Sequence, residues 1–252
     1  MRISVVTLGC KVNQYESDSL ISVLKNQGHE VFSHLQEADI YIINTCAVTN
    51  EAEKKSRQTV AKCRSLNPYA KILVCGCASE KNVKQFQDLQ NVTFISGVAN
   101  KLALANNLEN IGVNVESHSK YYDDNYVSIP TKTRAYIKIQ DGCNNFCSYC
   151  IIPYLRGRSR SRNIISILNE VNNLSQIVKE IVITGIDISD YKVDDEKALS
   201  VLIEQLQPYQ DIRFRLGSLE QGVVDNNLIE ACKKVHVCPH FHLSLQSGCN
   251  TV

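Results

Sequence analysis

Several features are missing from this sequence of 252 residues, and each absence argues against a class of protein. It contains no tryptophan, no apolar run of about 18 residues that could cross a membrane, and no charged and apolar leader segment after Met1. The formal net charge is only +1, so no overall field attracts nucleic acid, and a basic contact surface would have to be local. We therefore expect a globular, cytoplasmic protein.

Apolar residues make up 44% of the chain, which is enough for one large domain or two ordinary domains with hydrophobic cores. The 11 cysteines are an odd number, and no leader segment precedes them. Secreted disulfide frameworks normally use an even number of cysteines in a much shorter chain. The cysteines are therefore expected to be free thiols of a cytosolic protein.

The densest group of thiols consists of Cys143, Cys147 and Cys150. This spacing would also place the three residues on one face of an α-helix, where cysteine acts as a small buried apolar residue. The neighbouring residues favour a loop instead, because Asp141-Gly142 precedes the group, two asparagines lie inside it and Pro153 follows it. The sequence therefore predicts that this loop presents three thiols together.

Three thiols in one loop fit an iron-sulfur cluster better than they fit zinc. A structural zinc site usually combines short Cys-x2-4-Cys units and uses four ligands. Three ligands leave one iron of a 4Fe–4S cluster without a protein ligand, whereas an electron-transfer cluster is normally closed by a fourth cysteine. Spacing and loop context favour the cluster, and zinc or an inert core stay open as alternatives. An iron without a protein ligand is a position at which chemistry can occur.

The residues around these cysteines make the motif specific. It reads Gly142-Cys143-x3-Cys147-Ser148-Tyr149-Cys150-Ile151-Ile152-Pro153-Tyr154, followed by Arg156-Gly157 and Ser161-Arg162, and it resembles the radical S-adenosylmethionine (SAM) methylthiotransferases. The resemblance implies a 4Fe–4S cluster on the three cysteines, whose open iron binds the amino and carboxylate groups of SAM. Electron transfer then cleaves SAM to a 5'-deoxyadenosyl radical, while the protein aligns cluster, cofactor and target.

The amino-terminal part of the chain alternates apolar and amphipathic segments. We predict strands at 3–9, 39–45, 71–76 and 92–96, and helices at 16–26, 51–66, 80–89 and 101–108. This alternation implies a parallel sheet covered on both faces, as in a flavodoxin-like or Rossmann-like α/β domain, here at 1–115. Such sheets collect functional residues at the carboxyl ends of their strands.

Three further cysteines, Cys10, Cys46 and Cys77, each follow the end of a predicted strand. Because the carboxyl ends of parallel strands share one edge, the three thiols can converge on one metal site. Any one of them alone would be interpreted as a core thiol. Their equivalent positions favour a common site instead.

The sequences around these three cysteines are 8–17, 44–48 and 76–78, and they resemble the amino-terminal domain of the same methylthiotransferases. The resemblance implies a second 4Fe–4S cluster with an open iron, where sulfur is activated or donated. Cys75 should point to the opposite face of an extended strand from Cys77, and Cys63 and Cys232 lie in predicted helices. These three are interpreted as packing residues.

The composition changes after this domain. Residues 116–125 have no periodicity and few apolar side chains, so we predict a linker at 116–133. A second series then begins, with strands predicted at 133–140, 180–184, 212–216 and 241–245, and helices at 164–175, 197–206 and 225–235. Residues 134–252 therefore predict an incomplete radical SAM partial barrel, because the resemblance implies about six strand-helix units. It also implies a small β-rich RNA-binding domain beyond Val252.

An alternating arginine series, Arg156, Arg158, Arg160 and Arg162, lies beside the cysteine loop. Arginine recognises phosphate and carboxylate groups in bidentate geometry, so we expect contacts to the tRNA backbone or, for Arg156, to SAM. A solvated basic surface is the alternative.

Other SAM-binding residues follow from the resemblance at the ends of the later barrel strands. The predicted SAM contacts are Arg156, Thr184, Gly185, Glu220, His242 and Gln246. Gly217 and Gln221 depart from the family pattern around Glu220. The stretch from His236 to His242 could suggest zinc, but alternation along a strand turns His242 and Gln246 toward the barrel interior. The resemblance implies that this interior is the cofactor cavity.

Taken together, the resemblance implies a tRNA methylthiotransferase that converts N6-threonylcarbamoyladenosine beside the anticodon to its 2-methylthio derivative. The implied cofactors are two 4Fe–4S clusters and SAM, and the implied partners are the tRNA anticodon stem-loop and a flavodoxin-type or ferredoxin-type electron donor. The alternatives are a related enzyme acting on isopentenyladenosine or on a ribosomal-protein aspartate, a truncated non-catalytic iron-sulfur module, and a zinc-binding structural protein.

Overall fold

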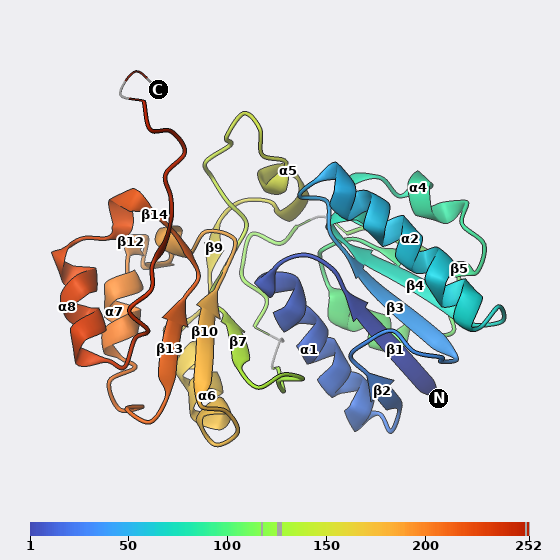
Figure 1. Cartoon of the computed structure of the whole chain (residues 1–252), viewed down its shortest axis with the longest axis horizontal. Coiled ribbons are helices and arrows are strands. Elements are labelled where there is room, and N and C mark those ends of the chain that lie inside the picture. The colour runs from blue at the N-terminus through green and yellow to red at the C-terminus, as the bar shows by residue number, and fades with distance from the viewer. Residues whose placement is uncertain (117, 125–127, 250, 252) are drawn as a thin grey trace. The chain divides into compact units, whose positions relative to one another are not determined.

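A computed structural model describes residues 1–116, 118–124, 128–249 and 251 of the chain (Figure 1). The chain packs into two compact units. The first comprises 1–119, 125–131 and 145–157, and the second comprises 120–124, 132–144 and 158–252. The predicted linker at 116–133 includes residues 117 and 125–127, which lie outside the described residues, and the predicted domain boundaries stay a prediction.

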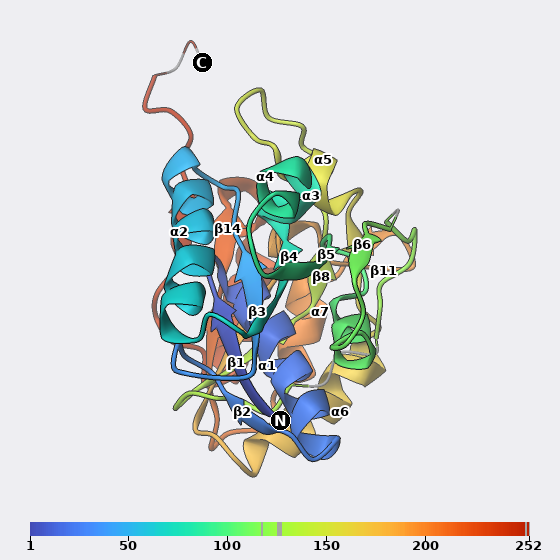
Figure 2. The ribbon, with the colours of Figure 1, turned by 90° about the vertical axis from the view of Figure 1, so that its right-hand side faces the viewer.

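Unit 1 is built on a six-stranded parallel sheet in the order β2-β1-β3-β4-β5-β6 (Figures 1 and 2). Its strands are β1 (Arg2–Thr7), β2 (Glu30–Phe32), β3 (Ile40–Thr45), β4 (Lys71–Gly76), β5 (Val92–Ser96) and β6 (Gly112–Asn114). The central strand β3 is buried along its whole length, as expected for a parallel sheet that is covered on both faces. The predicted α/β sheet is confirmed.

Helices cover both faces of this sheet. Helix α1 (Lys11–Asn26) and the 3-10 helix η1 (Lys101–Asn106) pack on one face, where they share a core with Ile42 and Leu73. The other face carries α2 (Asn50–Leu66), α3 (Cys77–Lys81), α4 (Lys84–Gln87) and α5 (Ile152–Arg156). Figure 2 shows α1 and α2 on opposite sides of the strands.

Two of the predicted helices of unit 1 begin or divide at other residues than predicted. The helix predicted at 80–89 is two short helices, because α3 begins directly after the strand at Cys77 and ends at Lys81, where Asn82 adopts an extended backbone. Helix α1 also begins at Lys11, immediately after Cys10, rather than at Glu16. Both cysteines therefore lie where a strand passes into a helix with almost no intervening loop.

Unit 2 is built on a three-stranded parallel sheet in the order β13-β10-β7 (Figure 1). The strands are β7 (Ala135–Lys138), β10 (Glu180–Thr184) and β13 (Arg213–Leu216). Helices α6 (Ile164–Ser175), α7 (Leu199–Glu204) and α8 (Asn226–Lys234) bury their apolar sides against one face of this sheet. The bounds predicted for α6 and β10 agree with the structure.

Short elements complete unit 2. They are β8 (Gln140–Asp141), β9 (Arg160–Ser161), β11 (Lys192–Val193), β12 (Glu196–Lys197), β14 (Ser218–Glu220), β15 (His242–Ser244), η2 (Ile188–Asp190) and η3 (Gln221–Val223). Strand β15, predicted as the fourth barrel strand, pairs in parallel with β14, and an isolated bridge joins Phe214 to Val237. In the described part of the chain, no helix is both long and apolar enough to cross a membrane.

Candidate functional site

The three strand-end cysteines of unit 1 lie at the carboxyl edge of its sheet. Cys10 follows β1, Cys46 follows β3 and Cys77 begins α3 after β4. Strands β1 and β4 both pair with β3, so the parallel registers bring these three ends to one edge. Cys10 is exposed, whereas Cys46 and Cys77 are buried. The fold therefore brings together three thiols that are far apart in the sequence.

Two glycines allow this close approach. Gly9 has φ +97°, and a Cβ at this position would lie 2.7 Å from the Cys46 sulfur. Gly76 has φ +102°, and its Cβ would lie 2.6 Å from the Thr45 carbonyl oxygen. Both backbone conformations favour glycine, and both positions lack room for a side chain. The glycines before Cys10 and Cys77 therefore let neighbouring strand ends pack against each other.

The thiols of this edge influence one another electrostatically. Burial raises the pKa of the Cys46 thiol, and the neighbouring Cys77 and Cys10 raise it further. A hydrogen bond with the Val48 backbone and the guanidinium of Arg156 act in the opposite direction on this pKa. A positive metal centre would reverse the balance, because a coordinating thiol is deprotonated outright. Three adjacent thiols form a donor set of the soft kind that iron-sulfur clusters use.

Cys63 and Cys75, which also belong to unit 1, are packing residues. Cys63 belongs to the core between the sheet and α2, and Cys75 belongs to the core between the sheet and α1. Burial raises the pKa of each thiol to about 12. Cys232 in unit 2 is half-buried and packs against the core beneath α8. Apolar surroundings keep such thiols protonated and inert.

Buried polar side chains lie directly beneath the three-cysteine edge. Asn13 donates hydrogen bonds to the carbonyl oxygens of Leu8 at 2.8 Å and Thr45 at 3.0 Å. Asn44 donates to the Asn13 carbonyl oxygen at 3.0 Å. The Thr45 hydroxyl donates to the Cys75 carbonyl oxygen at 2.6 Å and accepts a bond from the Ala78 backbone N–H at 3.2 Å. These bonds join the chain segments next to all three cysteines.

Three buried charged groups continue this network. Glu16 pairs with Arg156, whose two terminal nitrogens lie 3.0 and 3.1 Å from its carboxylate oxygens, and with the Lys101 ammonium at 2.5 Å. Arg156 also donates to the Asn13 side-chain oxygen at 2.9 Å, and Lys101 donates to that of Asn44 at 2.9 Å. All three charged side chains are 1% exposed. Sequence reasoning did not find Glu16 or Lys101, because each reads as a polar residue of an amphipathic helix.

Cys143, Cys147 and Cys150 lie in a loop, as predicted, and all three are half-buried. The Cys150 backbone N–H donates to the Cys147 carbonyl oxygen at 2.9 Å, which forms a turn between these two cysteines. Phe146 adopts a left-handed backbone with φ +46°, and its ring contacts that of Tyr154 edge to face at 5.5 Å. The boundary between the two compact units falls inside this loop, between 144 and 145.

Buried polar residues of unit 2 support the first part of this loop. The Gln140 amide donates hydrogen bonds to the Gly142 carbonyl oxygen at 2.7 Å and to the Ser159 hydroxyl at 2.9 Å. Its side-chain oxygen accepts a bond from the Asp187 backbone N–H at 2.8 Å. Gly185 lies close by, and a Cβ there would come within 2.9 Å of the Gln140 carbonyl oxygen. Gln140 therefore joins the segment before Cys143 to the loop that follows β10.

No group of three or more histidine, cysteine, aspartate or glutamate side chains is gathered closely enough to bind a single metal ion, as far as the described residues extend. Zinc draws its ligands to about 2.3 Å from one ion. In a 4Fe–4S cluster each cysteine binds a different iron, so the sulfurs lie farther apart. This finding therefore concerns mononuclear sites and leaves both three-cysteine sets as candidates for clusters.

The alternating arginines do not share one exposed surface. Arg156 is buried against Glu16, and Arg162 is buried in unit 2, where it pairs with Glu170 and with Asp124. Arg160 lies 3.4 Å from Asp141 and is partly buried, whereas Arg158 is exposed. The buried guanidinium groups of Arg156 and Arg162 are held by carboxylates within their own units. The contacts predicted for the series, to the tRNA backbone or, for Arg156, to SAM, stay a prediction.

The predicted SAM contacts in unit 2 lie at strand ends and beyond them. Thr184 ends β10 and is buried, and Gly185 follows it. Glu220 ends β14 and is exposed, and its backbone N–H donates to the Ser189 hydroxyl at 2.8 Å. His242 is exposed in β15, and its Nδ1 lies 2.8 Å from the Ser218 hydroxyl. Gln246 is exposed in a left-handed conformation with φ +63°.

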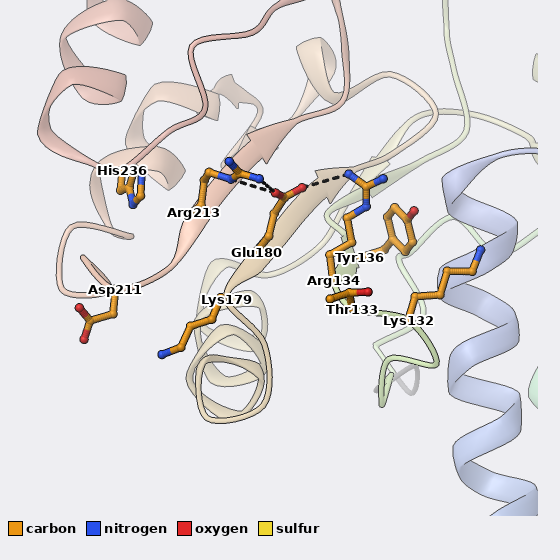
Figure 3. Close-up of a pocket in the computed structure, with 9 residues that line it drawn as sticks. All are labelled: Lys132, Thr133, Arg134, Tyr136, Lys179, Glu180, Asp211, Arg213 and His236. Carbon is orange, nitrogen blue, oxygen red and sulfur yellow. Dashed lines mark hydrogen bonds and ion pairs between the residues drawn. The ribbon is translucent and has the colours of Figure 1, made fainter.

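A pocket at the opposite end of the same strands has a volume of about 860 Å³ (Figure 3). Glu180 lies in it between Arg134, at 3.0 Å, and Arg213. Burial alone would raise the pKa of Glu180, but hydrogen bonds from Arg213 and Arg134 outweigh it and lower the pKa. The amino-terminal ends of barrel strands generally serve stability rather than catalysis, so we interpret these ion pairs as structural.

Both parts of the chain match families of known proteins. Residues 2–97 match the profile of the Uncharacterized protein family UPF0004, and residues 137–252 match that of the Radical SAM superfamily. A solved structure of the cobalamin-dependent S-adenosylmethionine radical enzyme OxsB is similar, with a TM-score of 0.64. It is 12% identical and covers 99% of this chain and 44% of its own, so this likeness concerns the fold alone.

Curated relatives match the chain along nearly its whole length. The threonylcarbamoyladenosine tRNA methylthiotransferase MtaB of Chlamydia pneumoniae is 40% identical over 98% of this chain and 58% of the relative. MtaB of Aquifex aeolicus is 34% identical over 100% of the chain and 64% of the relative.

A relative that is named for another substrate is also similar. The tRNA-2-methylthio-N(6)-dimethylallyladenosine synthase of Thermodesulfovibrio yellowstonii is 31% identical over 99% of this chain and 60% of the relative. The chain thus spans 58 to 64% of the length of these three relatives. Membership of the radical SAM superfamily implies one 4Fe–4S cluster and SAM. With the UPF0004 domain before the radical SAM domain, the chain belongs to the radical SAM methylthiotransferase family.

Proposed function

We propose that the whole protein is a tRNA methylthiotransferase that converts N6-threonylcarbamoyladenosine beside the anticodon to its 2-methylthio derivative. One observation carries this proposal: besides the loop that contains Cys143, the fold gathers Cys10, Cys46 and Cys77 at one sheet edge. A radical enzyme that only abstracts hydrogen needs one cluster. A second open cluster supplies a place from which sulfur can be delivered to the carbon radical.

The residues of the edge fit a cluster with one open iron. Cys10, Cys46 and Cys77 would supply three thiolates, and neither Cys63 nor Cys75 is placed as a fourth ligand, since both are buried in the apolar cores. When bound, the clusters supply one-electron chemistry and an iron position that is open to SAM or to sulfur. The protein's part is to hold the thiolates, orient the cofactor and keep water away.

Cofactor binding is also proposed for the loop that carries Cys143 and for residues at the carboxyl ends of the strands of unit 2. Cys143, Cys147 and Cys150 would hold the cluster that cleaves SAM, and the proposed SAM contacts are Thr184, Gly185, Glu220, His242 and Gln246. Carboxyl strand ends are where sheets of this class bind their ligands. Arg156 was predicted to join this set, but its guanidinium is engaged with Glu16, and we assign it another role below.

The proposed partners are the tRNA anticodon stem-loop and a flavodoxin-type or ferredoxin-type protein that donates electrons. The names of the relatives support tRNA as the substrate, and the two MtaB relatives are more similar to this chain than the dimethylallyladenosine synthase. Two SAM molecules would be used per product, one as the methyl donor and one as the source of the radical. The chain's net charge of +1 makes a local contact surface, rather than the overall field, responsible for tRNA binding.

Mass spectrometry of tRNA nucleosides tests this proposal. A strain that lacks the gene should lose 2-methylthio-N6-threonylcarbamoyladenosine and accumulate N6-threonylcarbamoyladenosine, and the intact gene should restore the product. A gene carrying Cys77→Ala should not restore it, because one ligand of the proposed second cluster is missing. Loss of the 2-methylthio derivative of isopentenyladenosine instead would assign the related activity, and unchanged nucleosides would exclude both.

A further inference from the structure

The Glu16, Arg156 and Lys101 triad joins two regions of the sequence that both carry proposed cluster ligands. Glu16 lies in α1, which begins directly after Cys10, and Arg156 ends α5, which follows Cys150. Lys101 begins η1 and reaches the same carboxylate from a third segment. Within unit 1, these three side chains therefore tie α5 to the helix that starts at the cysteine edge.

The triad is placed to act on the cysteine edge rather than only to hold helices together. Asn13 accepts a bond from Arg156 and donates to the carbonyl oxygens of Leu8 and Thr45, which lie beside Cys10 and Cys46. Lys101 bonds to Asn44, two residues before Cys46. One side chain, Asn13 or Asn44, therefore lies between each cation and the backbone next to the cysteines.

The charges of the triad do not cancel. Two cations share one carboxylate, so the formal charges of these three buried side chains sum to +1. Three thiolates more than cancel the positive charge of a 4Fe–4S core, so the loaded site is anionic and becomes more so on reduction. A buried ion network is weak evidence for a role in stability alone, because desolvation of the charges offsets their attraction. A nearby positive charge would favour the reduced site.

We propose that the Glu16, Arg156 and Lys101 triad is a positioning and charge-compensating support for the amino-terminal cluster site, and that its surplus charge raises the reduction potential of that site. This inference rests on the proposed function, because it requires that Cys10, Cys46 and Cys77 hold a cluster. Arg156, although it follows the loop of the SAM-cleaving cluster in sequence, then serves the other cluster site.

A charge series in the full chain tests the proposal. The reference protein carries Cys143→Ala, Cys147→Ala and Cys150→Ala, so only the amino-terminal set can bind iron. The charge variants, each in this background, are Arg156→Gln, Lys101→Gln, Glu16→Gln and the double variant Glu16→Gln with Arg156→Gln. Lys62→Gln removes an exposed charge from α2 and is the matched control. The measurements are iron and sulfide content, circular dichroism, and the midpoint potential from an anaerobic dithionite titration followed by electron paramagnetic resonance.

The midpoint should follow the summed charge of the triad, not the number of broken bonds. Arg156→Gln and Lys101→Gln should make reduction harder, and Glu16→Gln should make it easier. Each charge should change the equilibrium constant for reduction by about tenfold, or about 59 mV for a one-electron couple. In the double variant the triad again has a net charge of +1, so its midpoint potential should stay close to that of the reference protein. The midpoint potential of Lys62→Gln should also stay close to it.

The outcomes separate the two proposals. A reference protein that binds no cluster would remove the second cluster from the proposed function and this inference with it. A bound cluster whose midpoint is the same in all charge variants, or shifts in one direction for both Arg156→Gln and Glu16→Gln, would overturn the inference alone. If Arg156→Gln fails to fold, Lys101→Gln and Glu16→Gln still test the inference, because they should shift the midpoint potential in opposite directions.

Discussion

At the scale of single residues, the candidate site depends on groups that keep the strand ends close together. The cysteines are the proposed ligands, but Gly9 and Gly76 provide the space in which they meet, and Asn13 and Asn44 join the segments before them. The common position of these cysteines could be predicted, since each follows an apolar strand. The supporting network could not, because Glu16, Lys101 and Arg156 are distant in sequence and each resembles a solvated polar residue.

Replacement of Gly9 by alanine should damage the amino-terminal cysteine set specifically. The new methyl group would lie 2.7 Å from the Cys46 sulfur, and φ +97° is unfavourable for alanine. In a chain in which only this cysteine set is intact, Gly9→Ala should lower the bound iron to less than half of the amount bound with Gly9. Gly28→Ala is the matched control, because Gly28 has φ +83° but no atom within 4 Å of its Cβ position. It should cost about 1 kcal/mol of stability and leave the iron content unchanged. Equal iron loss in both variants would contradict the packing argument.

At the scale of elements, alternation and periodicity predicted the long segments better than the short ones. Helices α2 and α6 and strands β5 and β10 lie within one residue of their predicted bounds, because each has a clear apolar pattern. Strands β2 and β6 have three residues each and were missed, since so short a segment shows no period. Helix α5 was also missed, because it forms only where Leu155 and Arg156 pack into unit 1.

Strand β10 begins at Glu180, and its ion pairs give a pH-dependent prediction. The pKa of Glu180 is lowered in the folded protein, so its contribution to stability is present above its ordinary value of 4.5 and is lost as the pH falls through the folded value. Glu180→Gln should reduce the free energy of unfolding at pH 7 by about 1 kcal/mol, since Arg134 and Arg213 are half-exposed.

This difference between Glu180→Gln and the unmodified protein should disappear in acid, as measured by urea unfolding at a series of pH values. Glu230→Gln serves as the control, because the Glu230 pair with Lys233 is fully exposed on α8 and should leave unfolding unchanged. A difference that persists at low pH would show that Glu180 acts through packing rather than through its charge.

At the scale of the whole molecule, the chain carries two cysteine sets of different construction. Cys143, Cys147 and Cys150 come from a single loop and can be recognised in the sequence as a motif. The other set is assembled by parallel pairing of β1, β3 and β4, so it exists only when unit 1 is folded. The alternation of strands and helices predicted the parallel sheet, and the sheet implies that the three cysteines share one edge. Binding of a cluster by Cys10, Cys46 and Cys77 therefore requires that unit 1 be folded.

The two sets should therefore bind iron independently but differ in their dependence on folding. After anaerobic reconstitution, alanine at Cys10, Cys46 and Cys77 should halve the iron and sulfide per chain, and alanine at Cys143, Cys147 and Cys150 should halve them equally. Only the second variant should lose the ability to cleave SAM to 5'-deoxyadenosine. A chain that loses all its iron after either triple substitution would instead indicate one shared cluster. If the unmodified chain and the chain with alanine at Cys10, Cys46 and Cys77 bind equal amounts of iron, these three cysteines are packing residues.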